Sequence, residues 1–310
     1  MSVLICGSLA YDTIMVYPGH FKDDILPDKV HMLNVSFLVP QMRKEFGGCA
    51  GNIAYNLQML GGKPLPMGTV GSDFAPYAKR FDELGITRAH IKEFGDQYTA
   101  QAYIVTDMDD NQITAFHPGA MSMAHEQDIP KKGVKLGSVS PDGKKGMVLH
   151  ARQFADAGVP FLFDPGQGLP MFNGDELKLF ITQASYVAVN DYEAELMVKR
   201  TGWTLKQVAE RVDALIVTRG AKGSSIFAKK KHHEIPCARA EVLADPTGCG
   251  DAYRGGLLHG IAAGMDWETA GRVASLMGAI KIERPGTQNH KLTPEGFKAR
   301  FKKEFRYELK

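Results

Sequence analysis

The sequence has few cysteines, no excess of one charge and no long apolar run. Its four cysteines are scattered along the chain, at Cys6, Cys49, Cys237 and Cys249. They show neither the C-x-x-C pairs nor the Cys/His spacing of a zinc site, so we interpret them as free thiols in a reducing compartment. The apolar start at 3–6 is too short for a signal peptide, and no segment has the length of a membrane helix. The sequence therefore predicts a cytoplasmic protein.

The charges are nearly balanced, with 37 lysine and arginine residues against 35 aspartate and glutamate residues. This balance gives no electrostatic reason to expect nucleic acid or an anionic membrane as a partner. A basic run at 229–233 lies between two short apolar segments and is typical of a solvated turn. We therefore expect a small-molecule substrate, with no nucleic acid and no membrane as partner.

The second half of the chain alternates apolar strand segments with amphipathic helical segments. Strands are expected at 159–163, 186–189 and 214–217, and closing helices at 248–263, 267–283 and 294–305. This pattern is typical of an α/β fold, a three-layer α/β/α sandwich with a mostly parallel sheet. Ligands bind such sheets beyond the carboxyl ends of the strands. Those ends read Asp164, Asn190 and Thr218, so polar side chains are expected at a site there.

Two segments of the first half have a different character. Prolines and glycines punctuate short apolar pieces over 12–46, which predicts irregular structure with short strands and no helix. Segments 98–106 and 112–117 flank a polar turn and predict a hairpin. We group them as one small β-sheet lid, formed by two insertions at approximately 12–46 and 98–118 in a single domain spanning 1–310.

The most informative stretch is Asp245-Pro246-Thr247-Gly248-Cys249-Gly250-Asp251, where a turn with two glycines runs into a predicted helix. Backbone amides at a helix N-terminus bind anions, and Asp251 in the first turn can accept a proton from a hydroxyl group. A carboxylate of ordinary basicity suffices, because phosphoryl transfer depends mainly on positioning and charge stabilisation. A helix cap with only a stabilising role is the alternative. The motifs G-x-x-x-x-G-K-[ST] and G-x-G-x-x-G are both absent.

A second group consists of Ser8, Asp12, Gly47-Gly48 and Asn52. The glycine pair precedes a predicted helix and lets a ligand approach the backbone closely. Asp12 accepts and Asn52 both donates and accepts hydrogen bonds, so the two side chains suit vicinal hydroxyl groups. From the pattern alone, a purely structural turn at the glycine pair is the favoured alternative.

Together, the two motifs resemble the signatures of the ribokinase-like (PfkB-type) family of sugar and nucleoside kinases, in the family's order and over essentially the whole chain. Within the family the sequence is similar to bacterial adenosine kinases of the actinobacterial type, in segments such as 116–121 and 190–193. The resemblance implies ATP-dependent phosphorylation of the ribose 5′-hydroxyl of adenosine, giving AMP and ADP, in purine salvage. A sugar kinase or a kinase for another nucleoside is the alternative, and a non-catalytic binding protein on the same fold is a third.

The resemblance also implies a role for each matching position. Asp251 is the expected base, and the amides of Gly248, Cys249 and Gly250 form the expected anion hole. Substrate contacts are expected from Ser8, Asp12, Ser36, Gly48, Asn52, Phe116 and Gln167, with Phe116 stacked on the base. ATP is expected to bind Asn190, Glu193, Thr218, Gly220 and Gly223, with Mg²⁺ held through water by Glu193. Carbonyl groups around Asp245, Thr247, Arg284 and Gly286 are expected to hold a monovalent cation such as K⁺.

Two positions depart from the family pattern. Ala102 stands where a second aromatic wall for the base is expected, and Tyr103 points to the opposite face if the strand is regular. Gly168 stands where a second glutamine is expected. Both departures bear on adenine specificity and neither bears on phosphoryl transfer. Because exposed strand faces in lids often pair with a partner, we also expect a homodimer through the lid.

Overall fold

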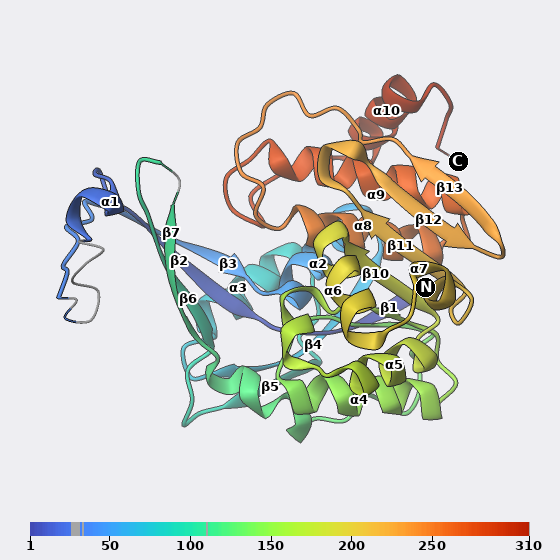
Figure 1. Ribbon diagram of the computed structural model, residues 1–310, viewed down its shortest axis with the longest axis horizontal. Helices are drawn as coiled ribbons and strands as arrows, with labels where there is room; N and C mark the ends of the chain where they lie inside the picture. The colour runs from blue at the N-terminus through green and yellow to red at the C-terminus, as the bar shows by residue number, and fades with distance from the viewer. Residues whose placement is uncertain (26–31, 33, 110, 310) are drawn as a thin grey trace.

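The computed structural model describes residues 1–25, 32, 34–109 and 111–309. A nine-stranded sheet forms the centre of the molecule, and a four-stranded sheet projects from it (Figure 1). The strands of the large sheet lie in the order β13 (Lys231–Ile235), β12 (Ser224–Ala228), β11 (Ala214–Thr218), β10 (Tyr186–Asn190), β9 (Phe161–Phe163), β8 (Leu136–Val139), β1 (Ser2–Cys6), β4 (Lys63–Gly71) and β5 (His90–Phe94). Only the β11–β12 and β12–β13 pairs of this sheet are antiparallel, so the expected mostly parallel sheet is confirmed.

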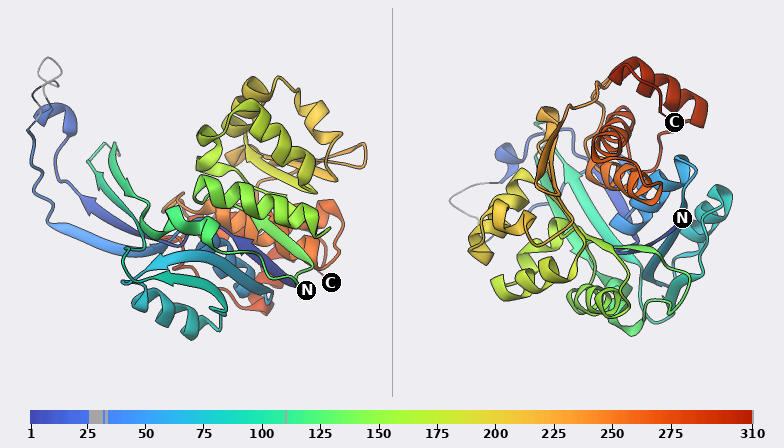
Figure 2. Two further views of the ribbon diagram at one scale, coloured as in Figure 1. Left: turned by 90° about the horizontal axis from the view of Figure 1, so that it is seen from below. Right: turned by 90° about the vertical axis from the view of Figure 1, so that its right-hand side faces the viewer.

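Helices cover both faces of the large sheet, which confirms the three-layer α/β fold (Figure 2). One face carries α4 (Lys144–Asp156), α5 (Gly174–Gln183), α6 (Asp191–Thr201) and α7 (Leu205–Ala209). The other face carries α2 (Cys49–Met59), α8 (Cys249–Ala262) and α9 (Trp267–Ile282), with α10 (Pro294–Phe305) packed outside α9. The remaining helices are α3 (Ala75–Leu84), the short α1 (Phe21–Asp24), and the 3₁₀ segments Gly119–Glu126, Gly166–Met171 and Gly220–Lys222.

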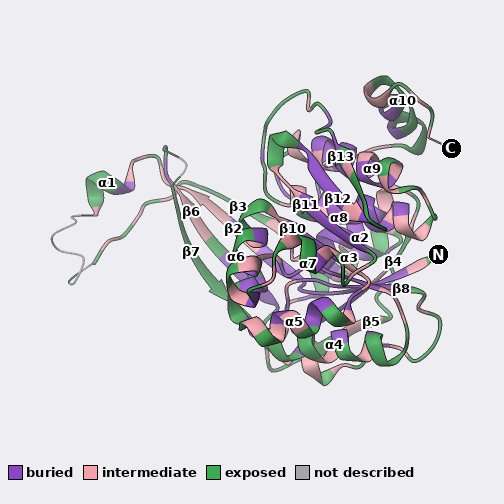
Figure 3. Cartoon of the chain, turned by 45° about the vertical axis from the view of Figure 1, so that its right-hand side comes forward, coloured by how far each residue is buried: buried purple, intermediate pink, exposed green. Residues whose placement is uncertain are grey.

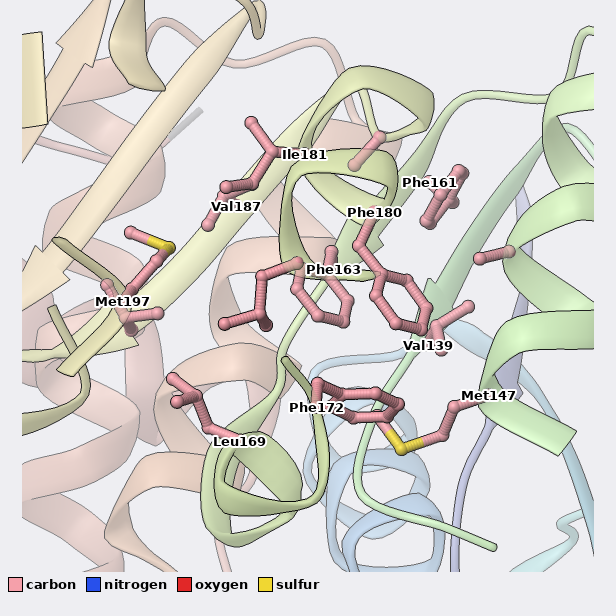
Figure 4. Packing of buried hydrophobic residues seen from close by; sticks show 14 of the residues in the cluster. Val139, Met147, Phe161, Phe163, Leu169, Phe172, Phe180, Ile181, Val187 and Met197 are labelled. Atoms are coloured by element: carbon pink, nitrogen blue, oxygen red, sulfur yellow. The ribbon is translucent and has the colours of Figure 1, made fainter. Parts of the chain in front are cut away.

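Alternation along the strands explains the two layers of core. Leu4 and Cys6 of β1 face the α4–α7 layer, whereas Val3 and Ile5 face α2 and α8. Successive side chains of a strand point to opposite faces, so a strand that is apolar at every position needs a helix layer on each side. In the α4–α7 layer, Phe163 stacks on Phe180 with ring centroids 4.4 Å apart (Figure 4). Full burial of each such side chain contributes roughly 1.5–3 kcal/mol to stability.

The projecting sheet, which we call the lid, consists of β3 (Gln41–Gly47), β2 (Ala10–Val16), β6 (Ala100–Thr106) and β7 (Gln112–His117), in that order. Segment 12–46 therefore contributes two strands of seven residues rather than only short ones. The expectation of no helix there was wrong, because α1 forms one turn at Phe21–Asp24. The side chain of Phe21 is buried. Its backbone amide donates to the carboxylate of Asp107, which lies at the tip of the β6–β7 hairpin. Residues 26–31 and 33 of this segment lie outside the described residues.

Element boundaries elsewhere follow the sequence pattern closely. The expected strands at 186–189 and 214–217 and the closing helices at 248–263, 267–283 and 294–305 are present to within one residue. The expected strand at 159–163 is shorter and spans only Phe161–Phe163. The basic run begins as a turn at Lys229 and Lys230, both with positive φ, and then continues as β13.

Candidate active site

The N-terminus of α8 places Asp251 in its first turn. Gly248 precedes the helix with a φ of 77°, a left-handed conformation that glycine adopts without strain. The amide of Cys249 donates to the carbonyl oxygen of Pro246 over 3.1 Å and closes the turn. This amide is therefore already used within the loop. The anion hole formed with Gly248 and Gly250 stays a prediction.

A hydrogen-bond network holds Asn52 against Asp251. The Nδ2 atom of Asn52 donates to Oδ2 of Asp251 over 2.8 Å. The Oδ1 atom of Asn52 accepts from Nε2 of Gln288 at 3.0 Å, which fixes which end of the amide faces Asp251. The same nitrogen of Gln288 lies 2.7 Å from the hydroxyl of Tyr77, which in turn donates to the carbonyl oxygen of Gly47. Sequence reasoning paired the regions of Asn52 and Asp251 but missed Gln288 and Tyr77, because neither belongs to a motif.

The carboxyl group of Asp251 has a pKa raised to about 7. Burial is the main cause, and the carboxylate of Asp164 adds to it. The hydrogen bond from Asn52 and the positive charge of Arg254 lower the pKa but do not outweigh burial. A carboxylate of ordinary basicity would suffice for phosphoryl transfer, but the pKa of Asp251 lies above its ordinary value. A general base with a pKa near the working pH combines a substantial ionised fraction with a high proton affinity.

Arg254 forms a buried ion pair beneath the site. Its Nη2 lies 3.0 Å from Oδ1 of Asp164 at the end of β9, and both side chains are about 5% exposed. Glu193 at the start of α6 lies 4.0 Å from the same nitrogen. Burial lowers the pKa of Arg254, but these two carboxylates outweigh it and raise the pKa above its ordinary value. A charged Arg254, one turn after Asp251, therefore ties α8 to the carboxyl ends of the sheet strands.

Strand register in the lid brings two predicted substrate residues, Asp12 and Phe116, onto one face with Ala102 between them. Asp12 pairs with Ala102, and Ala102 pairs with Phe116, so their side chains share a face. Phe116 is 51% exposed and Ala102 is buried. Tyr103 lies on the opposite face, where its hydroxyl donates to Gln101. Phe116 is therefore the aromatic side chain at this register position, and Ala102 supplies no second one.

Asp12 is a buried carboxyl group at the base of the lid. Its pKa is raised to about 6, mainly by burial and further by the carboxylates of Glu45 and Asp245. A Cβ atom at Gly47 would lie only 2.4 Å from Oδ2 of Asp12. Glycine at 47 thus makes room for this carboxyl group, which gives the first glycine of the pair a physical reason.

Ser8 and Gly48 support helix α2 in addition to any contact with substrate. The hydroxyl of Ser8 accepts from the amide of Cys49 over 3.1 Å and so caps α2. A Cβ atom at Gly48 would lie 2.5 Å from the carbonyl oxygen of Ser8 and 2.7 Å from the amide nitrogen of Ala10. This close approach of two backbones explains Gly48 without a ligand.

Two predicted substrate residues lie apart from the Asp12 face. Ser36 is exposed in the segment 34–40. Its neighbour Phe37 packs against Tyr17 and Phe21, beyond the distal end of β2, with ring centroids 4.9 and 5.0 Å away. Gln167 is exposed in the 3₁₀ segment Gly166–Met171. The structure does not bring Ser36 to Asp12, and Gln167 stays a prediction.

The predicted nucleotide residues lie at the carboxyl ends of β10 and β11. Asn190 and Glu193 form a capping box at the start of α6, in which each side chain accepts from the other's amide. Thr218 ends β11, and Gly220 and Gly223 shape the following turn with φ values of 53° and 79°. The structure brings these five residues to the same edge of the sheet.

The donor set at this edge suits Mg²⁺ held through water. Within the described residues, no group of three or more histidine, cysteine, aspartate or glutamate side chains is placed to hold a metal ion. Mg²⁺ commonly keeps several waters and binds through one or two carboxylates together with substrate phosphates. Glu193 is the carboxylate at this edge predicted to hold the ion's waters, whereas Asp164 is buried and paired with Arg254.

Two residues of the predicted monovalent cation site contact a lysine side chain. The ammonium group of Lys281 donates to the carbonyl oxygen of Asp245 over 2.7 Å and to that of Arg284 over 3.3 Å. These carbonyls belong to two of the residues expected to hold K⁺. The carboxylate of Asp245 accepts from the amides of Thr247 and Gly286. Lys281, which no motif pointed to, therefore contacts two of the four residues of that site, and the cation itself stays a prediction.

Comparisons with known proteins agree with this fold. The family model for pfkB family carbohydrate kinases matches residues 3–294. A nucleoside kinase from Methanocaldococcus jannaschii is 34% identical over 259 residues, which are 83% of this chain and 85% of that protein. The structure of Burkholderia thailandensis nucleoside kinase in complex with inosine has a TM-score of 0.90 and 53% identity, covering 99% of each chain. Its complex with ADP-inosine has a TM-score of 0.86 and 55% identity, covering 99% of this chain and 97% of that one.

The chain therefore belongs to the pfkB family of carbohydrate kinases, enzymes that transfer a phosphoryl group to a hydroxyl acceptor. The predicted family is confirmed, whereas the finer resemblance to adenosine kinases stays a prediction. Within the described residues we find no helix with the length and apolarity that crossing a membrane requires.

Proposed function

We propose that the protein is an ATP-dependent nucleoside kinase that phosphorylates the ribose 5′-hydroxyl of a purine nucleoside, adenosine or inosine. The observation that carries this proposal is the Asp251–Asn52 pair at the N-terminus of α8. Two similar proteins support a nucleoside as acceptor. The Methanocaldococcus protein is a nucleoside kinase, and the Burkholderia kinase was solved with inosine.

In the proposed reaction, Asp251 accepts the proton of the 5′-hydroxyl as that oxygen attacks the γ-phosphorus of ATP. The bond from the γ-phosphorus to the bridging oxygen breaks, and ADP leaves. Bound Mg²⁺ would neutralise charge on the phosphates, with Glu193 holding its waters. Amides at the start of α8 would stabilise the transferred group. Closure of the lid over the nucleoside would exclude water and so limit wasteful hydrolysis of ATP.

The face of the lid that carries Phe116 suits a purine base but does not distinguish the base of adenosine from that of inosine. Phe116 offers an aromatic surface on which either base can stack. Ala102, beside it in register, adds no second aromatic wall and no hydrogen-bonding group. A site that rejects one purine strongly needs polar groups that pair with only one of them. We therefore propose that adenosine and inosine are both accepted.

A coupled assay for ADP release across adenosine, inosine, ribose and fructose tests this proposal. Either purine nucleoside should react much faster than both sugars. Equal rates on ribose and adenosine would instead favour the sugar kinase alternative. Binding of nucleoside without ADP from any acceptor would favour a non-catalytic binding protein.

The base is tested by replacing Asp251 with asparagine. Asp251→Asn keeps the shape of the side chain but cannot accept the proton, so kcat should fall by about 10²–10⁴-fold while nucleoside binding is retained. Asp175→Asn, in the first turn of α5 and fully solvated, is the matched control and should keep full activity. Near-normal turnover by Asp251→Asn would remove Asp251 from the mechanism.

We also propose a homodimer through the lid and a cytoplasmic location. The location is supported by the four cysteines, all of which are free thiols. The dimer is supported by an apolar row across the outer face of the lid, opposite the face of Asp12. This row consists of the cross-strand neighbours Met42, Met15, Val105 and Ile113.

A further inference from the structure

Lys281 is a fully buried lysine near the end of α9. Its Nζ atom lies 2.7 Å from the carbonyl oxygen of Asp245 and 3.3 Å from that of Arg284. The carboxylate of Asp245 lies 3.9 Å away. An ammonium group has three donors and no acceptor, and here two backbone carbonyls and one carboxylate surround it. A lysine is almost never fully buried unless its charge is paired, so this environment is built around the positive charge.

These oxygens belong to the loop that leads into the predicted phosphate cradle. Asp245 begins the segment that runs through Gly248 into α8. Its carboxylate accepts from the amides of Thr247 and Gly286 at 2.9 and 2.8 Å, which joins the 245–248 loop to the 284–287 loop. Lys281 therefore bonds both loops at the point where they meet.

Helix α9 also packs closely against the start of α8. A Cβ atom at Gly278, one turn before Lys281, would lie 3.7 Å from the carbonyl oxygen of Cys249. Residues i and i+3 lie on the same side of a helix, so Lys281 approaches the same end of α8. The positive charge thus lies behind the turn whose amides would receive the transferred phosphoryl group.

We propose that the ammonium group of Lys281 is a built-in substitute for a bound monovalent cation, so that this kinase orders its anion hole without K⁺. The inference rests on the proposed kinase activity and concerns the same site. Lys281 is a positioning residue here, because it acts through the 245–248 loop and touches neither nucleoside nor phosphate. A lysine fixed by the chain is present at any salt concentration, whereas a free ion binds only when it is available.

The charged form of Lys281 is consistent with its surroundings. Burial lowers the pKa of Lys281, and the positive charge of Arg43 lowers it further. The carboxylates of Asp245 and Asp251 act in the opposite direction, as does Cys249. The net effect lowers the pKa of Lys281 from its ordinary value. The ammonium form supplies one hydrogen to each carbonyl and a third toward the carboxylate of Asp245.

The first test is the cation dependence of the unmodified enzyme. ADP release should proceed at the same rate in potassium, sodium and choline chloride of equal ionic strength. Clear activation by potassium over choline would overturn the proposal while leaving the kinase function intact. Absence of activity in every salt would instead contradict the proposed function.

The second test removes the ammonium group. Lys281→Ala leaves a polar cavity between the two loops and should reduce kcat by at least about tenfold in choline chloride. Potassium or ammonium chloride should restore much of this loss, with KM for the nucleoside little changed. Lys281→Met fills the cavity without a charge and should not respond to either salt. Lys298→Ala, on an exposed position of α10, is the matched control and should behave as the unmodified enzyme.

Thermal unfolding supplies a readout that does not depend on activity. The unfolding midpoint of Lys281→Ala should rise in potassium relative to choline, because the ion binds the folded state only. The midpoint of the unmodified protein should be the same in both salts. If Lys281→Ala is active and stable but shows no response to potassium or ammonium in either measurement, Lys281 does not replace a cation.

Discussion

At the scale of single residues, the position of each charge decides what the site can do. Asp251 has the side-chain type expected of a base, but burial and the hydrogen bond from Asn52 set its proton affinity. Asn52 is in turn oriented by Gln288. A motif identifies the first two residues because they lie in local glycine patterns. It cannot identify Gln288, which lies 236 positions from Asn52 in the sequence.

The raised pKa of Asp251 predicts a pH dependence of catalysis. The base must be ionised, so kcat/KM should rise about tenfold per pH unit below pH 7 and level off above it. Asn52→Ala removes a hydrogen bond that lowers this pKa, so the rising limb should move to higher pH and the plateau should fall. Initial rates between pH 5.5 and 9 with saturating ATP check both expectations.

Comparing the two enzymes with the same nucleotide separates Asp251 from the ionisation of ATP itself, which is common to both. If the limb stays at the same pH in Asn52→Ala, it reports a group other than Asp251. A flat profile in the unmodified enzyme would contradict a base with a pKa near 7.

At the scale of elements, the sequence predicts strands that have a local apolar pattern. It misses strands whose stability depends on pairing with a distant segment. Strands β10 and β11 of the large sheet are apolar at nearly every position, and this local pattern placed them correctly. The lid strand β3 carries the sequence QMRKEFG, which lacks that signal. It forms because β2 offers it seven paired positions. Pairing with a distant strand supplies this stability, and periodicity in the segment alone does not reveal it.

The lid strands also lead to a prediction about assembly. Strand β7 is an edge strand whose residues are all exposed (Figure 3). One end of the outer apolar row is Ile113 of β7, which is 43% exposed, and the other end is Met42 of β3, which is 69% exposed. Contiguous exposed apolar groups on a sheet with free edges favour a protein partner. We therefore expect sedimentation velocity to give the mass of two 34.0-kDa chains.

Charge substitutions on the lid distinguish this interface from another one. Ile113→Glu places a charge within the apolar row and should convert the dimer to monomers at micromolar concentration. Leu179→Glu, on α5 with 52% exposure, is the matched control and should leave the mass unchanged. A dimer that survives Ile113→Glu but not Leu179→Glu would place the interface on the helices that cover the large sheet and not on the lid. A monomer at every concentration would contradict the proposed assembly.

At the scale of the whole molecule, stability depends on pH through carboxyl groups buried near the site. Asp142 follows β8 and is 2% exposed. Its Oδ1 accepts from the amide of Gly143, while its Oδ2 is buried without a partner. Burial raises the pKa of Asp142 to about 8. No pattern in the sequence indicates this, because an aspartate after a strand usually reaches water.

The sign of this effect follows from the raised pKa. The folded protein holds the proton of Asp142 more tightly than the unfolded chain, whose pKa is near 3.8. Its contribution to stability is therefore full below about pH 4 and is lost as the pH rises toward 8. The raised pKa values of Asp251 and Asp12 act in the same direction. His290, whose pKa is lowered by burial to about 4, acts oppositely and destabilises the fold as the pH falls below 6.5.

Asp142→Asn removes the titrating group and keeps an oxygen for the amide of Gly143. Urea unfolding should show similar free energies for both proteins at pH 4. At pH 8 the variant should be more stable by about 1–3 kcal/mol, a range set below the full value of a shift this large because buried sites relax when they become charged. Asp96→Asn, at an exposed position, is the control and should change stability equally at both pH values. A variant no more stable than the unmodified protein at pH 8 would mean that water or a counter-charge reaches Asp142 in the folded state.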